Sequence, residues 1–190
     1  MNNTELANPA PLGLAAFGMT TILLNLHNAG FFAMDDIILS MGIFYGGIAQ
    51  ILAGILEYKK GNTFGLTAFA SYGSFWLTLV AVLLMPKMGL ADAPDPGFLG
   101  FYLGLWGVFT LLMFFGTLKS ARMLQFVFLS LAVLFILLSV GNIISSVLVI
   151  HIAGWTGLVC GACAVYLAMG EVLNGQFGRT VLPVGEPRTP

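Results

Sequence analysis

The sequence predicts an all-α integral membrane protein with six transmembrane helices. Of its 190 residues, 58% are hydrophobic and only 8% are charged, whereas a soluble domain carries about 25% charged residues. The apolar residues fall into stretches of the length that a helix needs to cross a bilayer, roughly 17 to 25 residues. These stretches occupy most of the chain, so they leave no room for a separate soluble domain.

We expect the six helices at residues 12–32, 37–57, 64–85, 98–118, 122–143 and 151–173. The first begins near Leu12, because Pro9 and Pro11 lack backbone donors and suit positions just before a helix or in its first turn. Residues 1–11 then form an N-terminal segment and residues 12–173 the transmembrane domain. Residues 174–190, whose end is rich in proline and polar residues, are expected to form a flexible cytoplasmic tail.

Basic residues concentrate on one side of the predicted membrane domain. Lysine or arginine follows the second, fourth and sixth stretches, at Lys59, Lys60, Lys119, Arg122, Arg179 and Arg188. The opposite side has aspartates, His151 and a single basic side chain of the Lys or Arg type, Lys87. By the positive-inside rule, both termini lie in the cytoplasm. The first stretch lacks a basic leader and a small-residue cleavage site, so we expect no removable signal peptide.

The six stretches pair into three helical hairpins that carry an internal repeat. When the first hairpin is laid over the third, Asn28 aligns with Asn142 and Glu57 with Glu171. The sequence FGLTAF at residues 64–69 also echoes LGLAAF at residues 12–17. Internal repeats in transporters relate segments around a common axis. The repeat therefore predicts that the odd-numbered helices surround a central pathway.

The repeat also predicts which side chains meet on that axis. It pairs Phe17 with Leu131, and the middle hairpin offers Phe69 or, one turn on, Tyr72. The alternative is that Phe17 and Leu131 face lipid or the protein core like any other apolar residue. Residue type alone does not decide between these two interpretations.

Residues 8–17 read NPAPLGLAAF and include Asn8, Pro9, Pro11 and Gly13. This motif resembles the signature of the acetate uptake transporter family, and the resemblance covers nearly the whole chain. It implies a permease for acetate and succinate in the bacterial cytoplasmic (inner) membrane, coupled to protons and assembled as a homohexamer. The family's narrow hydrophobic constriction is formed by the aromatic residue that ends the motif, a tyrosine in helix three and a leucine in helix five. The matching positions are Phe17, Tyr72 and Leu131.

No Asp, Lys or Arg lies near the centre of any predicted span. A bare carboxylate at mid-membrane would need a positive partner, because desolvating an unpaired charge is very costly. Two interpretations remain open. The substrate crosses the constriction as a neutral, protonated acid, or it crosses as an anion helped by hydroxyls, amides and backbone dipoles.

Several polar side chains are candidates for substrate binding or selectivity. Thr21, Asn25 and Asn28 repeat at three to four residues and therefore share one face of the first helix. Gln50 and its repeat partner Ala164 lie at equivalent points of the second and sixth helices. The alternative role for the threonine and asparagines is hydrogen bonding between packed helices, which is common in membrane bundles.

Four titratable residues are candidates for a proton relay. Glu57 and Glu171 lie near the cytoplasmic ends of their helices, and His27 and His151 lie toward the opposite surface. Glu57 could instead form an interfacial ion pair with the lysines that follow it, and each histidine could be structural. The cysteines at 160 and 163 have CxxC spacing, but we expect them to pack as small hydrophobes in mid-span.

The sequence therefore favours transport over other function classes. A passive acetate channel is the main alternative, because no span has an obvious break of the kind common in alternating-access carriers. A membrane scaffold without transport activity is a further alternative. An enzyme is the least favoured class, because the sequence contains neither an HExxH motif nor a Ser/His pair. We expect no cofactor, metal site or nucleic-acid partner.

Overall fold

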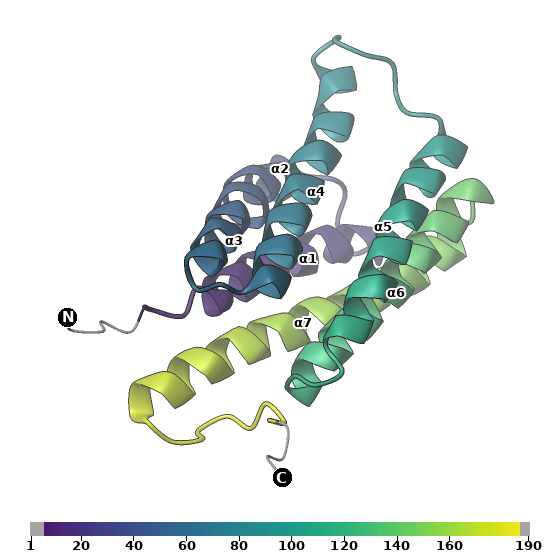
Figure 1. Cartoon of the computed structure of the whole chain (residues 1–190). Coiled ribbons are helices and arrows are strands. Elements are labelled where there is room, and N and C mark those ends of the chain that lie inside the picture. The colour runs from purple at the N-terminus through teal and green to yellow at the C-terminus, as the bar shows by residue number, and fades with distance from the viewer. Residues whose placement is uncertain (1–5, 187–190) are drawn as a thin grey trace.

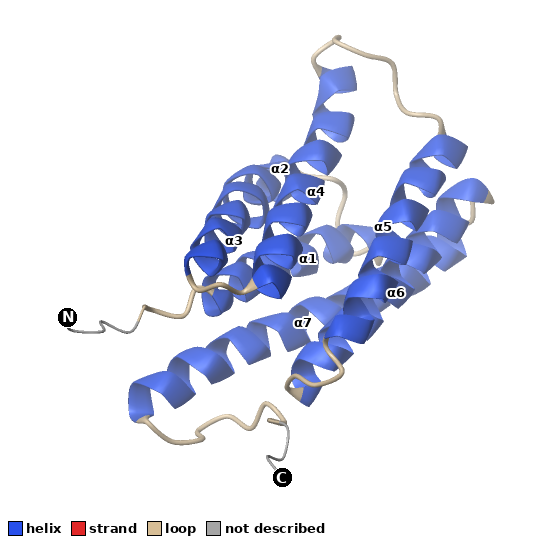
Figure 2. Cartoon of the chain, viewed as in Figure 1, coloured by secondary structure: helices blue, strands red, loops and turns tan. Residues whose placement is uncertain are grey.

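The structure is a computed structural model that describes residues 6–186 as a bundle of helices. Its elements are α1 (Ala10–Asn28), α2 (Asp36–Met41), the π-helix η1 (Gly42–Ala49), α3 (Gln50–Lys59), α4 (Thr63–Lys87), α5 (Pro96–Gly116), α6 (Arg122–Ile143) and α7 (Val147–Phe177). Figure 2 shows helices joined by short loops, without strands in the described part of the chain. Six helical spans are long and apolar enough to cross a membrane, with α2, η1 and α3 forming one of them. The predicted fold class is confirmed.

The start of α1 follows from its prolines. Pro9 is the N-cap residue and Pro11 lies in the first turn, where a missing backbone donor costs no hydrogen bond. The helix ends at Asn28, earlier than the predicted residue 32. Gly30 adopts a φ of 86° just beyond this end, a conformation that glycine adopts without steric cost.

The second span contains a π-helix that the sequence analysis did not predict. The wider turn covers the eight residues Gly42–Ala49 in the middle of the span and ends directly before Gln50. Gly46 lets this segment pack closely against α4, because a side chain there would collide with the indole of Trp76. The second span stays helical throughout, as expected, and π-helical segments occur frequently at functional sites.

The spans are arranged around a common axis. The third span, α4, packs most extensively on the second (η1 and α3), and the fifth, α6, packs on the fourth, α5. The first span, α1, packs on the last, α7, and so closes the ring. The two helices of the middle hairpin, α4 and α5, lie apart along most of their length (Figure 1). The middle hairpin is therefore not a closed pair, whereas α6 and α7 of the third hairpin pack closely together. The odd-numbered helices turn inward, and each even-numbered helix packs beside the next odd one.

The segment 181–185, called the C-terminal strap below, is ordered against the bundle. The Asn174 side chain accepts hydrogen bonds from the backbone N–H groups of Val181 and Leu182, at 2.6 Å and 2.9 Å. The first two N–H groups of α6 donate to the carbonyls of Gly185 and Val184, at 2.8 Å and 3.1 Å. Val184 itself is buried. The predicted flexible tail is thus partly fixed, because its carbonyls cap a helix that has no side-chain cap.

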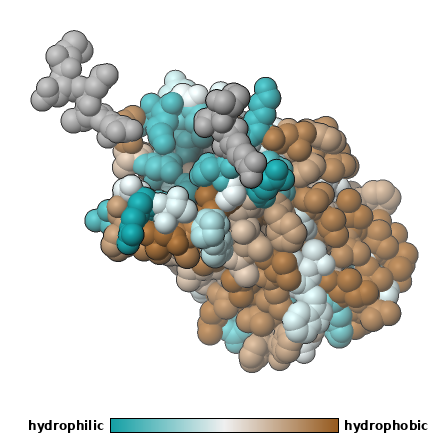
Figure 3. Space-filling model, turned by 90° about the horizontal axis from the view of Figure 1, so that it is seen from below, coloured by the Kyte–Doolittle hydropathy of each residue, from teal (hydrophilic) through white to brown (hydrophobic). Residues whose placement is uncertain are grey.

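The outside of the bundle is suited to lipid. Figure 3 shows hydrophilic residues gathered near the two chain ends and hydrophobic residues over most of the remaining face. Large apolar side chains are exposed on every span, including Phe44, Leu105 and Leu112. Exposed apolar surface of this extent is typical of a membrane-embedded protein.

Candidate functional site

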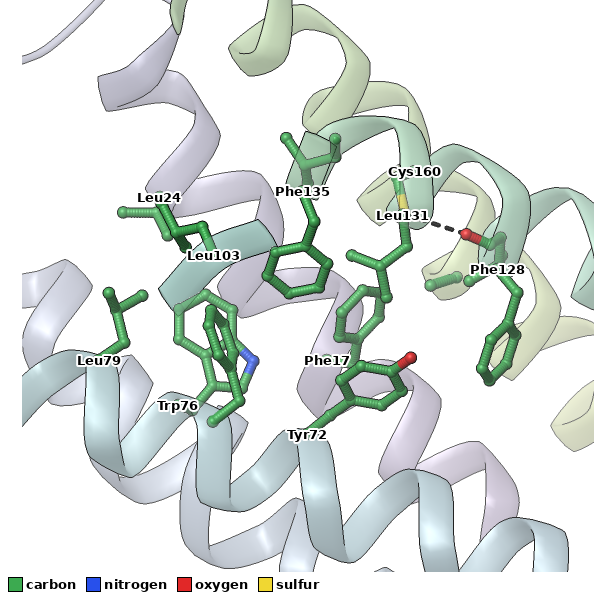
Figure 4. Close-up of a cluster of buried hydrophobic side chains, with 14 of the residues drawn as sticks. Phe17, Leu24, Tyr72, Trp76, Leu79, Leu103, Phe128, Leu131, Phe135 and Cys160 are labelled. Carbon is green, nitrogen blue, oxygen red and sulfur yellow. Dashed lines mark hydrogen bonds between the residues drawn. The ribbon is translucent and has the colours of Figure 1, made fainter. Parts of the chain in front are cut away.

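The three predicted constriction residues lie together at the centre of the bundle. Phe17 comes from α1, Tyr72 from α4 and Leu131 from α6, and all three are buried. The rings of Phe17 and Tyr72 have centroids 6.1 Å apart. In Figure 4, Leu131 points toward these two rings. Each of the three odd-numbered spans thus contributes one side chain, as the repeat predicts.

A hydrogen bond fixes the ring of Tyr72 to a helix outside this trio. The Tyr72 hydroxyl donates to the Thr110 hydroxyl on α5 at 2.9 Å, and Thr110 donates to the carbonyl of Trp106 at 2.7 Å. The sequence analysis did not identify Thr110. The available signal was that Thr110 is a rare polar residue inside the fourth span.

An inner cavity lies between the constriction and the cytoplasmic end, the end assigned to the cytoplasm by the positive-inside rule. It is lined by Leu14, Phe17, Gln50, Ala68, Phe69, Tyr72, Val127, Phe128 and Leu131. Its volume of about 20 Å³ has room for roughly one water molecule. The surface of this cavity is apolar throughout, although Gln50 and Tyr72 are among the residues that line it.

An outer cavity of about 230 Å³ lies on the other side of the constriction. Asn28, Asn142 and His27 line it together with apolar side chains from α1, α4, α5 and α6. The repeat pairs Asn28 with Asn142, and the structure places both around the same space. The two cavities lie on opposite sides of the three predicted constriction residues.

A second aromatic layer separates the constriction from the outer cavity. Phe75 packs edge-on against Phe135 with ring centroids 5.1 Å apart, and against Trp106 at 5.2 Å. Phe75 also lines the outer cavity. The sequence analysis assigned no pathway role to Phe75 or Phe135, because aromatic residues are too common in these spans to single them out.

The carbonyl oxygen of the Gln50 side chain has no hydrogen-bond partner. Gln50 is 1% exposed, and Oε1 is one of four buried side-chain polar atoms that lack a partner in the described residues. The others belong to Thr21, Glu57 and Trp76. Buried polar atoms are nearly always paired in proteins, so the unpaired oxygen singles out Gln50, although the surface of the neighbouring inner cavity is apolar.

The polar stripe of α1 is divided between packing and the pathway. The Asn25 amide donates to the carbonyl of Thr21 at 2.9 Å and accepts from Asn28 at 3.1 Å. Asn25 also packs directly against Gly157 of α7. Asn28 lines the outer cavity, whereas Thr21 and Asn25 line neither of the two cavities on the axis.

Glu57 is buried at the cytoplasmic end of α3 and is 1% exposed. Its Oε2 accepts a hydrogen bond of 2.7 Å from Asn62, whose own oxygen accepts from Gly65 at the start of α4. No lysine of the described chain lies within 4.0 Å of Glu57. The structure therefore does not show the ion pair that was the alternative reading of this residue.

The NPAPLG motif joins three spans at the cytoplasmic end. The Asn8 amide donates to Glu171 of α7 at 2.8 Å, and its oxygen accepts from Lys60, just beyond α3, at 3.2 Å. Gly13 lies against the ring of Phe69, where any side chain would collide. The motif thus positions α1 against both neighbours and gives Phe69 room to line the inner cavity.

Of the remaining candidates, His27 lines the outer cavity, whereas His151, Ala164 and the cysteines line neither of the two cavities on the axis. His27 has its Nδ1 atom 3.0 Å from the carbonyl of Phe32, and His151 lies beside Gly30. Ala164 is fully buried in the cluster of side chains that contains the constriction residues, but it does not line the inner cavity. Cys160 donates to the carbonyl of Val127 at 3.5 Å (dashed line in Figure 4), and both cysteines are free thiols.

Comparison with known proteins agrees with this geometry. Residues 1–186 match the sequence model of the GPR1/FUN34/yaaH family. The chain belongs to this family. Among members of the GPR1/FUN34/yaaH family, the succinate-acetate/proton symporter SatP of Escherichia coli K12 is 78% identical over 186 residues, which are 98% of this chain and 99% of that protein. Acetate permease A of Emericella nidulans is 37% identical over 201 residues, covering 95% of this chain and 66% of that permease.

A solved structure, that of the bacterial acetate channel SatP, superposes with a TM-score of 0.94 at 78% identity. The match covers 95% of this chain and all of that chain (100%). These likenesses confirm the predicted family resemblance and the predicted membrane fold. This member of the GPR1/FUN34/yaaH family is a multi-pass protein of the inner membrane.

Proposed function

We propose that this protein takes up acetate and succinate across the inner membrane together with protons. The similarity to a succinate-acetate/proton symporter over nearly the whole chain supports this assignment. The observation that carries it in the structure is the arrangement of two cavities along the axis, separated by the three constriction residues and the aromatic layer of Phe75 and Phe135. Transport, and not catalysis, is the activity that such a path supports.

In this proposal, Phe17, Tyr72 and Leu131 form the constriction that substrates cross. Asn28 meets the carboxyl group in the outer cavity, and Gln50 lies beside the path on the cytoplasmic side of the constriction. Ala164 limits the size of the substrate from behind the constriction, because it is fully buried in the cluster of side chains that contains those residues. Glu57 and Glu171 border the cytoplasmic exit, where each forms a hydrogen bond with an asparagine.

A passive channel for acetate is the second candidate function. It is favoured by the spans themselves, which run through the membrane without a non-helical break, and by the similar solved structure of an acetate channel. The two candidates differ in one respect. A symporter accumulates acetate above its external concentration when protons flow inward, whereas a channel only equilibrates it.

The experiment is uptake of labelled acetate by liposomes that contain the purified protein, compared with a variant that fills the constriction. Leu131→Trp is expected to reduce uptake to the level of empty liposomes. The matched control is Leu129→Trp on the same helix, where the side chain is 44% exposed and uptake is expected to persist. A folded Leu131→Trp protein with undiminished uptake would contradict the assigned path.

We also propose that the protein assembles as a homohexamer, as the family resemblance implies. Exposed apolar faces on α5, with Phe101, Leu105 and Leu112, support contact with other subunits or lipid. Mass measurement of the protein in detergent tests the number of subunits.

A further inference from the structure

The outer cavity has room for a small carboxylic acid, and part of its surface is polar. Its volume is about 230 Å³, against about 20 Å³ for the inner cavity. Its polar lining residues are His27, Asn28 and Asn142. Further inward, the layer of Phe75 and Phe135 and the constriction residues include no charged side chain. A carboxylate that enters this apolar part loses its hydration without gaining a counter-charge, which is costly. The outer cavity is therefore the place where the substrate can gain a proton before it crosses.

One nitrogen of the His27 ring is occupied and the other is accessible. Nδ1 lies 3.0 Å from the carbonyl oxygen of Phe32. Because a carbonyl oxygen can only accept, this hydrogen bond places the ring proton on Nδ1. Nε2 bonds to no described residue and is not among the buried atoms that lack a partner, so it is open to water. The neutral ring therefore presents an acceptor at Nε2, and the protonated ring presents a donor there.

No described charged group is paired with this ring. The titratable side chains at the same end of the bundle are Asp35, Asp36, Lys87, Asp92, Asp95 and His151. None of the carboxylate oxygens in the described range lies within 4.0 Å of His27. Asp35 and Asp95 accept hydrogen bonds from the first turns of α2 and α5, and Asp36 lies 3.9 Å from Lys87. His151, from α7, lies beside Gly30. A carboxylate that enters the outer cavity thus meets a histidine without a partner of opposite charge.

Two asparagines bring amide donors to the same cavity. The Asn28 amide donates to Asn25 at 3.1 Å, and the Asn142 amide donates to the carbonyl of Leu138 at 2.8 Å. Each amide nitrogen has two hydrogens, so each asparagine keeps a second N–H that bonds to no described residue. A carboxylate can accept hydrogen bonds from these amides while it shares the cavity with the histidine.

We propose that His27 transfers a proton to the incoming carboxylate in the outer cavity, so that a neutral acid crosses the constriction. The inference rests on the proposed acetate uptake. In this step the Nε2–H bond of the protonated ring breaks and an O–H bond forms on the carboxylate. The ring returns to its neutral form with the proton on Nδ1, and acetate becomes acetic acid. His27 then takes its next proton from the outer solution, so one proton enters with each acetate and no net charge crosses.

The surroundings favour this transfer. In water an imidazole ring holds a proton more firmly than a carboxylate does. The transfer, however, converts an ion pair into two neutral molecules, and an apolar environment favours neutral molecules over charged ones. Apart from His27 and the two asparagines, the residues that line the outer cavity are apolar. The position is also suitable, because His27 is one residue from the outer end of α1. Ten residues, about 15 Å of helix, separate it from Phe17.

The test is the pH dependence of acetate uptake by liposomes that contain the full-length protein. The initial rate is measured at constant total acetate between pH 8 and pH 5, the range in which histidine side chains titrate, and uptake by empty liposomes is subtracted. We expect the wild-type rate to rise as the pH falls and then to level off within this range, once the histidine is fully protonated. A rate that follows the concentration of free acetic acid, rising about tenfold per pH unit without levelling, would overturn the proposal.

His27→Asn removes the titrating group and keeps an N–H near the position of Nδ1, which can still donate to Phe32. We expect an uptake rate lower by about tenfold or more near neutral pH and a profile that no longer levels off. A purely structural role would lower the rate at every pH and leave the shape of the profile unchanged. His151→Asn is the matched control, because His151 is the other of the two histidines and does not line the outer cavity. It should keep the wild-type profile.

The outcomes separate this inference from the proposed function. If the wild-type protein takes up no more acetate than empty liposomes do, the proposed function itself is wrong. If it takes up acetate and His27→Asn keeps the wild-type profile, the function stands and the role of His27 is wrong. If His27→Asn does not fold, the wild-type profile, with or without levelling, still decides.

Discussion

The hydroxyl of Tyr72 donates a hydrogen bond of 2.9 Å to the hydroxyl of Thr110. This bond joins α4 to α5, whose backbones lie apart (Figure 1) and whose side chains also meet in a 2.7 Å hydrogen bond between the hydroxyls of Thr78 and Tyr102. It also holds the tyrosine ring 6.1 Å from the ring of Phe17, measured between centroids. Thr110, which lies outside the predicted constriction, thus fixes the orientation of the Tyr72 ring.

Thr110→Val tests this link, because valine keeps the shape of threonine and removes the acceptor. The buried Tyr72 hydroxyl then lacks a partner, at a cost of about 1–3 kcal/mol. We expect a lower thermal unfolding temperature and faster entry of acids larger than acetate, since the ring is free to rotate. Both are measured on the purified protein, by thermal denaturation and by uptake of labelled lactate.

Tyr72→Phe provides the matched comparison. It removes the donor, so Thr110 loses only one of its two hydrogen bonds and keeps the one to Trp106. The double variant should be no less stable than Thr110→Val alone, because the two residues act as a pair. Additive losses in the double variant would contradict the assigned coupling.

Leu131→Ala should widen the constriction and admit larger acids such as lactate. Leu131 is 3% exposed, and truncating a buried leucine costs about 2–5 kcal/mol, so assembly must be verified before uptake is compared. Leu129→Ala, on the exposed face of the same helix, serves as the control. An intact Leu131→Ala protein with an unchanged substrate range would argue against the placement of Leu131 in the path.

Much of the fold, and part of the lining of the cavities, was predictable from the sequence. Six apolar stretches predict six spans, the prolines predict where α1 begins, and the repeat pairs Asn28 with Asn142, which line one cavity. Each of these inferences depends on a local pattern or on a repeated one. These patterns are reliable in a membrane protein, because a segment in lipid must pair its own backbone hydrogen-bonding groups and therefore forms a helix.

Other features depend on contacts that no local pattern reveals. In the sequence, the π-helical segment of the second span is indistinguishable from an ordinary apolar stretch. Its glycines are explained only by the structure, where they lie against the side chains of Trp76 and Leu77. The partner of Tyr72 lies 38 residues away. The C-terminal strap was predicted to be flexible from its composition, whereas Asn174 and the uncapped start of α6 fix it in place.

Asn8→Ala should impair uptake through its effect on the cytoplasmic end of the bundle. It removes the hydrogen bonds to Glu171 and Lys60 and so loosens α1 from both neighbours. We expect a severalfold lower initial rate of acetate uptake with similar expression. Thr4→Ala, outside the motif and outside the described residues, is the control, and equal rates for the two variants would show that Asn8 has no role in transport.

Val184→Asp should release the C-terminal strap. Val184 is 4% exposed and packs with Leu14 and Phe69 in one apolar cluster. A charged side chain cannot stay there unpaired, so the variant loses at least the burial of valine, about 1.5–3 kcal/mol. Val181→Asp places the same charge at a position that is 41% exposed. The two variants should differ in thermal unfolding temperature, and equal stability would mean that the strap contributes nothing to it.

The most direct test of proton-coupled uptake is the accumulation of labelled acetate in liposomes that contain only this protein, with and without an inward proton gradient. The account predicts accumulation above the external concentration that disappears when an uncoupler is added and causes no net charge movement. Acetate that merely equilibrates at the same rate with or without the gradient would contradict proton coupling and identify the protein as a passive channel.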